Sequence, residues 1–301
     1  MAIRLDGRVA IVTGAGNGLG RTYALALAAR GAKVVVNDLG APLDGSGGSQ
    51  APADAVVAEI KAAGGEAVAS FDSVSDRDSA ARIVKTAVDA FGTVDIVVNN
   101  AGVLRDRTFH KTTLDDFEFV LKVHLLGAAY VTHAAFPIMR EKGYGRILMV
   151  TSNTGLYGNF GQTAYGAAKL GVVGLMNTLK LEGAKYNVTV NALAPMAITR
   201  MTAPTALFEK VNKTQIAPEQ VASMVVWLAS EDCTATGQIL VATGGYYSSV
   251  RYVEGAGARM DKQKLATPED IQRVWSQILD GKGGRSYNDV SDNMAFAVLG
   301  E

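Results

Sequence analysis

Thr13-Gly14-Ala15-Gly16-Asn17-Gly18-Leu19-Gly20 is the stretch that decides the fold. The apolar run Val9–Thr13 leads into it, and a helical pattern, Gly18–Arg30, follows it. The spacing is T-G-x-x-x-G-x-G, not G-x-G-x-x-G, because Leu19 and Arg21 occupy the positions of the third glycine. Glycines between a strand and a helix allow positive φ angles and let the backbone approach a pyrophosphate at the helix N-terminus. The stretch therefore predicts dinucleotide binding, and a glycine-rich turn without a ligand is the alternative.

Outward from this turn, short β-branched runs alternate with longer amphipathic stretches. The expected strands are Val9–Thr13, Lys33–Asp38, Ala67–Asp72, Ile96–Asn99, Gly145–Thr151, Val188–Ala194 and Gln238–Ala242. The expected helices between them are Gly18–Arg30, Ala53–Ala63, Ser79–Phe91, Leu114–Glu141, Thr163–Tyr186 and Pro218–Ser230. We therefore expect an α/β fold of the Rossmann type, with a doubly wound, seven-stranded parallel sheet, helices on both faces and a C-terminal extension. The cofactor crevice is expected beside the first, second and fourth strands, where the strand order reverses.

Two segments fall outside this alternation. Residues 39–52 are rich in Gly, Ser and Pro and predict a long loop after the second strand. Residues 246–301 follow the seventh expected strand and contain one expected helix, Pro268–Leu279, with Thr267 as its N-cap. We expect residues 1–245 to form a dinucleotide-binding and catalytic Rossmann domain. Residues 246–301 are expected to form an extension that packs on the same domain or on a partner subunit.

The balance of charges excludes several classes of partner. The 301 residues include 29 Lys plus Arg and 29 Asp plus Glu, so the formal net charge is zero. Neither a nucleic-acid footprint nor a polybasic membrane anchor is expected, because both need a basic excess. His110 and His133 have no cysteine or acidic neighbours in a metal-ligand pattern, so we expect no metal site.

Features that report on the compartment favour the cytoplasm. Cys233 is the only cysteine, which excludes an intramolecular disulfide and fits a reducing compartment; we expect it to fill space in the core. The N-terminal apolar run is shorter than that of a signal peptide, and no stretch approaches the length of a transmembrane helix. The chain ends in Leu299-Gly300-Glu301 and not in the S-K-L peroxisomal address, so a cytoplasmic location is expected.

Residues at the strand ends complete the cofactor half of the expected site. Asp38 ends the second strand, where a carboxylate can accept hydrogen bonds from the adenosine ribose hydroxyls. It would repel the 2′-phosphate of NADP by roughly 4 kcal/mol at about 4 Å and an effective dielectric of about 20, so NAD is the expected cofactor. The alternative for Asp38 is an ordinary surface carboxylate. For Asn99–Gly102, at the end of the fourth strand, the alternative is a turn built from Asn and Gly. The other expected cofactor-binding residues are Gly14, Asn17, Gly18, Leu19, Gly20, Asp72, Ser73, Asn99, Ala101 and Gly102.

Tyr165-Gly166-Ala167-Ala168-Lys169 carries the chemical half of the expected site. Its spacing places Tyr165 and Lys169 on one face of a helix. A phenol has a pKa of about 10, and a cation within about 4–6 Å lowers it, so Lys169 is expected to lower the pKa of Tyr165. Tyr165 would then accept the proton of an alcohol. Ser152 ends the fifth strand and can orient the substrate oxygen. A surface Tyr–Lys pair and a loop serine are the alternative, which the order of all the motifs along the chain disfavours.

Together these motifs resemble the short-chain dehydrogenase/reductase family, from about Gly7 to Gly245. More narrowly, the chain resembles the (3R)-hydroxyacyl-CoA dehydrogenase units of peroxisomal multifunctional enzymes of type 2. The stretches that carry this resemblance are Val35–Gly40, Leu104–Arg107, Tyr157–Gln162, Lys180–Tyr186 and Arg200–Thr202. It implies NAD as cofactor, a homodimer or homotetramer, and an extension that helps to complete the site. It also implies catalytic residues Ser152, Tyr165 and Lys169, of which the last two also contact the cofactor, and a nicotinamide wall of Pro195, Ala197, Ile198 and Thr199.

Three departures from the family pattern bear on this site. His124 stands where the wider family has an Asn that supports a water-mediated proton relay, although the peroxisomal subgroup also has His. An imidazole that packs against a helix is the alternative for His124. Pro195-Met196 replaces the usual Pro-Gly and is expected to reshape the nicotinamide wall. The peroxisomal enzymes continue into a hydratase and a sterol-carrier unit, so any hydratase partner is expected to be separate.

Oxidation of a 3-hydroxyacyl-CoA to a 3-oxoacyl-CoA is the leading functional hypothesis. A hydroxysteroid or another alicyclic alcohol would use the same catalytic residues, and a non-catalytic dinucleotide-binding protein would not need them. Trp227 and Trp275 are expected in the core and not in a binding site. The phosphates of CoA need basic residues at the pocket mouth, and the candidates are Arg105, Arg107, Arg200, Lys210 and Lys213.

Overall fold

The computed structural model describes residues 2–42, 44–197 and 216–299. Contacts divide the chain into two compact units, Met1–Ser249 and Val250–Glu301. The first unit contains the central sheet and all of the expected catalytic residues.

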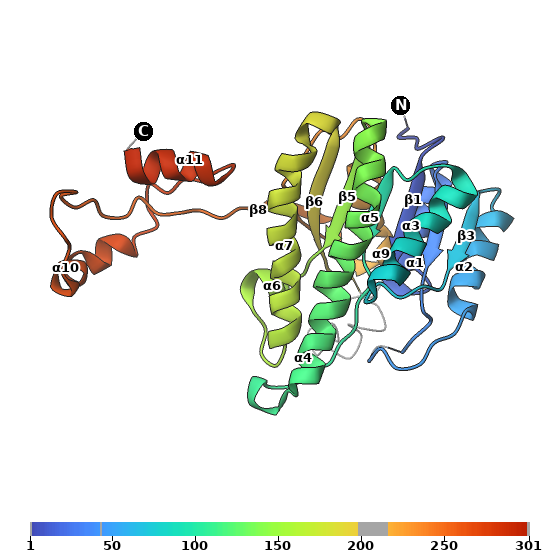
Figure 1. The fold of residues 1–301 in the computed structure, drawn as a ribbon, viewed down its shortest axis with the longest axis horizontal. Helices are drawn as coiled ribbons and strands as arrows, with labels where there is room; N and C mark the ends of the chain where they lie inside the picture. The colour runs from blue at the N-terminus through green and yellow to red at the C-terminus, as the bar shows by residue number, and fades with distance from the viewer. Residues whose placement is uncertain (1, 43, 198–215, 300–301) are drawn as a thin grey trace. The chain divides into compact units, whose positions relative to one another are not determined.

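An eight-stranded sheet forms the centre of the first unit (Figure 1). Its strands are β1 (Val9–Thr13), β2 (Lys33–Asn37), β3 (Ala67–Ser70), β4 (Ile96–Asn99), β5 (Gly145–Val150), β6 (Val188–Pro195), β7 (Ile239–Thr243) and β8 (Tyr246–Val250). The spatial order is β3-β2-β1-β4-β5-β6-β7-β8, and β1 to β7 pair in parallel. The order reverses between β1 and β4, which is the switch point expected for a dinucleotide. The doubly wound Rossmann fold is therefore confirmed.

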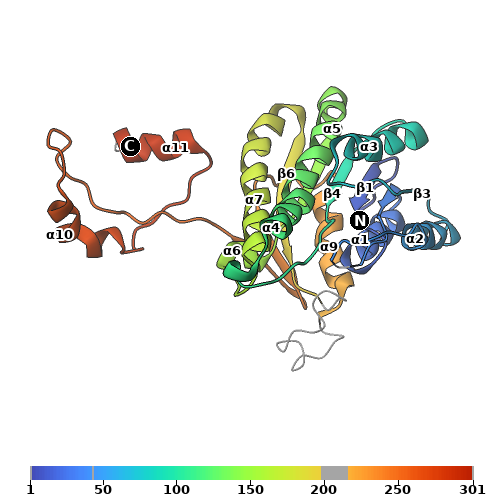
Figure 2. The same cartoon turned by 60° about the horizontal axis from the view of Figure 1, so that its bottom comes forward.

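Helices cover both faces of the sheet. They are α1 (Gly18–Ala29), α2 (Ala51–Ala62), α3 (Arg77–Phe91), α4 (Leu114–Leu121), α5 (Gly127–Lys142), α6 (Asn153–Tyr157), α7 (Thr163–Gly183) and α9 (Pro218–Ala229). Helix α1 contacts α2 and α9, whereas α5 contacts α3 and α7. In Figure 1 α5 and α7 cross in front of the strands and α9 lies behind them, and the turned view of Figure 2 keeps these two layers. The strands β1, β4 and β5 are buried along their whole length, and most of their side chains are apolar, as expected for parallel strands that are covered on both faces.

The expected helix Leu114–Glu141 contains a wider turn. Helix α4 passes through a π-helical turn, Lys122–Leu126, into α5. The helical stretch Leu114–Lys142 has 29 residues and is long and apolar enough to cross a membrane by length and composition alone. This finding corrects the expectation that no stretch reaches that length. Its most apolar window is 44% buried inside the protein, and α5 packs against α3 and α7.

The eighth strand was not expected from the sequence. Gly244 and Gly245 form a two-residue turn after β7, with φ angles of 42° and 76°. Two consecutive positive φ angles are what a tight hairpin turn requires, and Tyr246–Val250 contains two aromatic residues and a valine that favour strands. Most of β8 is exposed, so it lacks the buried apolar run that identifies the other strands.

The second unit contains two helices among its described residues, where one was expected. Helix α10 (Pro268–Ile278) matches the expected helix and has a capping box between Thr267 and Asp270. Helix α11 (Val290–Met294) was missed. It continues into a π-helical turn, Ala295–Leu299, and although Asp289 caps it, no buried apolar face at residues 290–297 marks it as a helix.

Expectations for the core were correct for Cys233 and wrong for both tryptophans. Cys233 is 2% exposed and belongs to the hydrophobic core. Trp227 is 42% exposed, because it shares the outer face of α9 with exposed Ser223 four residues earlier. Trp275 in α10 is 53% exposed.

Candidate active site

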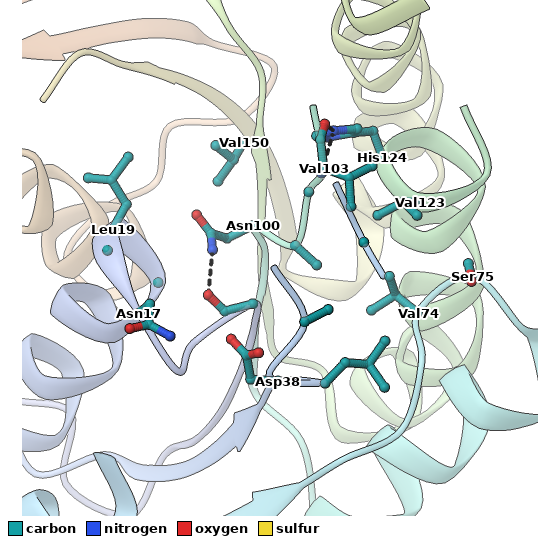
Figure 3. A pocket seen from close by; sticks show the side chains of 18 of the residues that line it. Asn17, Leu19, Asp38, Val74, Ser75, Asn100, Val103, Val123, His124 and Val150 are labelled. Atoms are coloured by element: carbon teal, nitrogen blue, oxygen red, sulfur yellow. Dashed lines mark hydrogen bonds between the residues drawn. The ribbon is translucent and has the colours of Figure 1, made fainter. Parts of the chain in front are cut away.

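A cavity of about 430 Å³ opens at the carboxyl ends of the parallel strands. Residues after β1, β2, β4, β5 and β6 line it, so segments that are far apart in the sequence meet there. Figure 3 shows Asn17 and Leu19 on one side of the cavity and Val103, Val123 and His124 on the other. The sequence-predicted residues that line it are Gly14, Asn17, Gly18, Leu19, Gly20, Asp38, Asp72, Ser73, Ala101, Gly102, Ser152, Tyr165, Lys169, Pro195 and Ala197.

The glycine loop after β1 needs its glycines for two separate reasons. Gly14 and Gly18 have φ angles of 64° and 53°, a region that other residues rarely adopt. At Gly20 a Cβ atom would lie 2.1 Å from the carbonyl oxygen of Gly14, and at Gly14 it would lie 2.8 Å from the Cα atom of Ala101. The loop therefore places bare backbone and the first turn of α1 against the cavity, as binding of a pyrophosphate requires. This local geometry fits a dinucleotide.

Asp38 is fixed by the backbone of two loops. Its Oδ2 atom accepts a hydrogen bond from the Gly16 amide at 2.7 Å, and its Oδ1 atom accepts one from the Gly40 amide at 2.6 Å. The carboxylate thus links the glycine loop to the segment after β2 and faces the cavity (Figure 3). The end of β2 therefore presents a fixed carboxylate to the cavity.

The structure separates two neighbouring asparagines that end β4. Asn99 does not line the main cavity: its side chain is buried and its Nδ2 atom donates to Thr132 Oγ1 at 2.9 Å. Asn100 lines the cavity instead, and its Nδ2 atom donates to the carbonyl oxygens of Thr13 and Gly14 at 2.9 and 3.1 Å. Asn100, and not the expected Asn99, is therefore the asparagine whose side chain lines the main cavity. Alternation along a strand puts adjacent side chains on opposite sides, but it does not say which side holds the ligand.

Asp72 and Ser73 lie at the cavity but already have polar partners. The Asp72 carboxylate accepts a hydrogen bond from Arg82 Nε at 2.8 Å, and Ser73 Oγ lies 2.9 Å from Ser75 Oγ. Val74 and Ser75 also line the cavity and were missed. They follow a strand that ends at Ser70, two residues earlier than expected, and no motif marks them.

Ser152, Tyr165 and Lys169 line the same cavity as the glycine loop. Ser152 follows β5 and caps α6, where its Oγ atom accepts a hydrogen bond from the Thr154 amide at 3.1 Å. Tyr165 and Lys169 lie one helical turn apart at the start of α7. The fifth strand thus stops earlier than expected, and a short helix that the sequence analysis missed begins at the serine. This places a hydroxyl, a phenol and an amine at one end of the cavity.

The expected effect of Lys169 on Tyr165 is not found. Burial raises the pKa of Tyr165 above its ordinary value, and a hydrogen bond with Ser152 opposes this rise. The Lys169 Nζ atom lies 5.5 Å from the centre of the Tyr165 ring and donates to the Val150 carbonyl oxygen at 2.7 Å. Burial lowers the pKa of Lys169 to about 7. The helical spacing showed that the two groups are neighbours, but it contained no information on how strongly burial would act on each.

Replacement of Lys169 by Met is expected to stabilise the protein most at neutral pH. The pKa of Lys169 is about 7 in the folded state and 10.5 in the reference state, so between these values the unfolded chain binds more protons. Stability of the wild type therefore rises with pH across this window. Chemical denaturation at pH of about 7 and about 10 should show that the advantage of Lys169→Met shrinks at the higher pH. An advantage that does not depend on pH would contradict the burial argument.

Only some of the residues expected at the nicotinamide wall and at the pocket mouth belong to the described part of the chain. Pro195 and Ala197 line the cavity, whereas Ile198, Thr199, Arg200, Lys210 and Lys213 lie outside the described residues. Within the described part of the chain, no group of three or more His, Cys, Asp or Glu side chains is placed to hold a metal ion.

Arg105, one of the basic residues expected to bind the phosphates of CoA, already has partners within the chain. Its Nη1 atom bonds to Asp116 Oδ1 at 2.5 Å, and its Nε atom donates to the Asp44 carbonyl oxygen at 3.1 Å. Its guanidinium lies 4.2 Å from the centre of the Phe119 ring. Asp44 belongs to the long loop after β2, and Gly45 of this loop lines the cavity together with Phe119. Arg105 therefore ties this loop to α4 beside the cavity.

Replacement of Arg105 by Met is expected to weaken dinucleotide binding about tenfold, because one or two charge-assisted hydrogen bonds that hold the loop are lost. Titration calorimetry with NAD would measure this change. Arg140→Met is a matched control, since Arg140 makes a similar ring contact with Tyr186 on the surface. Equal NAD affinity in Arg105→Met and the wild type would show that the loop needs no such tie.

Comparisons with known proteins agree with this geometry. The profile described as short chain dehydrogenase matches residues 8–212. A short-chain type dehydrogenase/reductase of Mycobacterium tuberculosis is 52% identical over 281 residues, which cover 92% of this chain and 96% of the relative.

A larger relative and two solved structures are also similar. Peroxisomal multifunctional enzyme type 2 of Drosophila melanogaster is 49% identical over 283 residues, and the match spans 92% of this chain but only 46% of that enzyme. The structure of this full-length enzyme superposes with a TM-score of 0.81 at 40% identity, covering 97% of this chain and 49% of that one. A 7α-hydroxysteroid dehydrogenase complexed with NADH and 7-oxoglycochenodeoxycholic acid has a TM-score of 0.72 at 29% identity, covering 80% of this chain and 95% of that one.

Proposed function

This chain belongs to the short-chain dehydrogenase family, and we propose that it oxidises a 3-hydroxyacyl-CoA to the 3-oxoacyl-CoA with NAD as cofactor. It is an oxidoreductase that acts on a CH–OH group. The observation that carries the proposal is the meeting of the glycine loop and Asp38 with Ser152, Tyr165 and Lys169 around one cavity.

The glycine loop and Asp38 would hold NAD, which when bound would supply the acceptor for the hydride on the carbinol carbon of the substrate. The Tyr165 phenolate would accept the proton of the substrate hydroxyl as the carbonyl forms. Ser152 would donate a hydrogen bond to the substrate oxygen and hold it beside the phenol. Lys169, when protonated, would donate hydrogen bonds to the ribose hydroxyls near the nicotinamide. One hydride and one proton leave the alcohol, so the reaction is balanced.

Asp38 supports NAD over NADP. Both of its oxygens are held by backbone amides, so the carboxylate cannot easily turn away from a 2′-phosphate. The Gly loop, Asn100 and Ala101 supply a backbone surface for the pyrophosphate side of either cofactor, so the choice depends on Asp38.

The similarity to the peroxisomal multifunctional enzymes supports an acyl-CoA substrate. One similar solved structure, the hydroxysteroid dehydrogenase, supports a bulky alicyclic alcohol instead. Peroxisomal multifunctional enzyme type 2 matches at 49% identity, whereas the hydroxysteroid dehydrogenase has 29%. With NAD, initial rates measured by the absorbance of the reduced nicotinamide should be highest with 3-hydroxyacyl-CoA thioesters. Turnover of hydroxysteroids with no turnover of any acyl-CoA would overturn the proposed substrate.

Location and assembly are part of the same proposal. The single cysteine, buried in the core, supports a reducing compartment such as the cytoplasm, whereas several relatives are named as peroxisomal. Fluorescence microscopy of the tagged chain in its own cells would distinguish the two. We also propose a homodimer or homotetramer in which residues 246–301 pack on the same Rossmann domain or on the partner subunit. Light scattering of the full chain and of a variant that ends at Ser249 would test this role.

A further inference from the structure

A buried histidine borders the proposed catalytic tyrosine. His124 is 4% exposed and lies in the π-helical turn between α4 and α5. Its ring meets the Tyr165 ring edge to face, with the ring centres 5.1 Å apart and the planes at 88°. Turns of this kind occur often at functional sites, because they redirect one side chain within a helix.

The histidine ring is held on its second side by the segment after β4. Its Nε2 atom lies 3.0 Å from the amide nitrogen and 2.8 Å from the carbonyl oxygen of Val103 (Figure 3). A Cβ atom on Gly102 would lie 2.2 Å from His124 Cε1, so only glycine leaves room for the ring. The ring therefore contacts both the cavity wall and Tyr165.

Two polar atoms near this ring lack a hydrogen-bond partner among the described residues. They are His124 Nδ1 and Asn99 Oδ1, and both are buried. A buried polar atom without a partner costs about 1–3 kcal/mol. Asn99 is fixed at its other end by Thr132, as described above, and its pairing in β4 holds its backbone.

Both residues line a second, smaller cavity of about 10 Å³ behind the main one. Thr13, Ala101 and Val123 are among its other lining residues. This volume corresponds to about one water molecule. Water can donate to both atoms or accept from a ring N–H, so it satisfies either neutral form of the histidine. Burial, reinforced by the charge of Lys169, lowers the pKa of His124 to about 3, so the ring is neutral at ordinary pH.

We propose that this small cavity binds one water molecule that joins Asn99 Oδ1 to His124 Nδ1, and that the joined pair positions the Tyr165 ring. His124 is a positioning residue in this account, because it contacts the ring of Tyr165 and not the substrate. The water links the end of β4 to α7 through the histidine. The positioning role, but not the water site, rests on the proposed function.

The water site is tested without any assay. A crystal structure of the wild type should show a water oxygen within about 2.7–3.2 Å of both Asn99 Oδ1 and His124 Nδ1. A cavity without density, or direct contact between the two side chains, would overturn the proposal. This result does not depend on whether the enzyme oxidises an alcohol. The crystal structure therefore tests the water site, and the initial rates test the proposed function.

The positioning role is tested with a matched pair of variants. Asn in place of His124 keeps a polar atom near the position of Nδ1, and Gln keeps one near the position of Nε2. His124→Asn should retain the water and most of kcat, whereas His124→Gln should lose the water and about tenfold of kcat, with little change in KM. Equal kcat in both variants, or better rescue by Gln, would overturn the role of the water.

The pH dependence of kcat separates a misplaced tyrosine from a general loss of structure, which would lower kcat without shifting its pH dependence. The hydrogen bond with Ser152 lowers the pKa of Tyr165, so a misplaced ring should lose this effect. Asp106 also acts on the phenol and raises its pKa, and the Lys169 Nζ atom lies 5.5 Å from the centre of the ring. In His124→Gln the alkaline rise of kcat should therefore begin at higher pH than in the wild type, and in His124→Asn it should not. An unchanged profile in both variants would contradict the positioning role.

Discussion

Tyr165→Phe is expected to abolish the oxidation of alcohols while NAD still binds. The substitution removes only the phenolic oxygen, which is the proposed acceptor of the substrate proton. General acid–base catalysis is commonly worth about 10²–10⁴-fold in rate, so kcat should fall by at least that range. Initial rates and a calorimetric titration with NAD would separate chemistry from cofactor binding.

Tyr157→Phe provides the matched control for this experiment. Tyr157 lies at the end of α6, is 68% exposed and does not line the cavity. Its loss should leave both kcat and NAD affinity near the wild-type values. Retention of turnover in Tyr165→Phe would show that another group moves the proton.

Asp38→Asn is expected to shift the preference from NAD toward NADP by as much as about 10³-fold. Removal of the charge relieves a repulsion of roughly 4 kcal/mol, and each 1.4 kcal/mol is about tenfold in affinity. The amide oxygen of Asn can still accept one of the two backbone hydrogen bonds that fix Asp38. The ratio of kcat/KM for the two cofactors measures the shift.

Asp72→Asn is the control for the loss of a carboxylate at the same cavity. The Asp72 carboxylate is paired with Arg82, so its charge is already compensated. The cofactor ratio should hardly change in this variant. An equal shift in both variants would assign the preference to the net charge of the cavity and not to Asp38.

The sequence predicted the sheet well because parallel strands are buried on both faces. The ends of β1 and β4 were placed correctly, and the others were correct to within two residues. Exposed elements were missed for the converse reason. The strand β8 and the helix α11 lack a buried apolar run, and only the Gly244-Gly245 turn and the cap at Asp289 marked them.

The sequence predicted that the expected catalytic residues meet at one cavity, but it did not predict their electrostatics. Spacing and strand ends brought Ser152, Tyr165 and Lys169 to one cavity with the glycine loop. The direction of the Tyr165 pKa shift was wrong, because burial is set by packing from several elements that no local motif encodes. The contacts of Arg105 with Asp44 and Asp116 could not be predicted for the same reason, since they join a long loop to α4.

We expect hydrogen to pass directly from the alcohol carbon to the nicotinamide, and isotope labelling of the substrate would show this transfer. A 3-hydroxyacyl-CoA deuterated at C3 would be incubated with the wild-type enzyme and NAD, and the reduced nicotinamide analysed by mass spectrometry. Each reduced nicotinamide should carry one deuterium. Reduced nicotinamide that carries no deuterium, or oxidation of the thioester with no reduction of NAD, would contradict it.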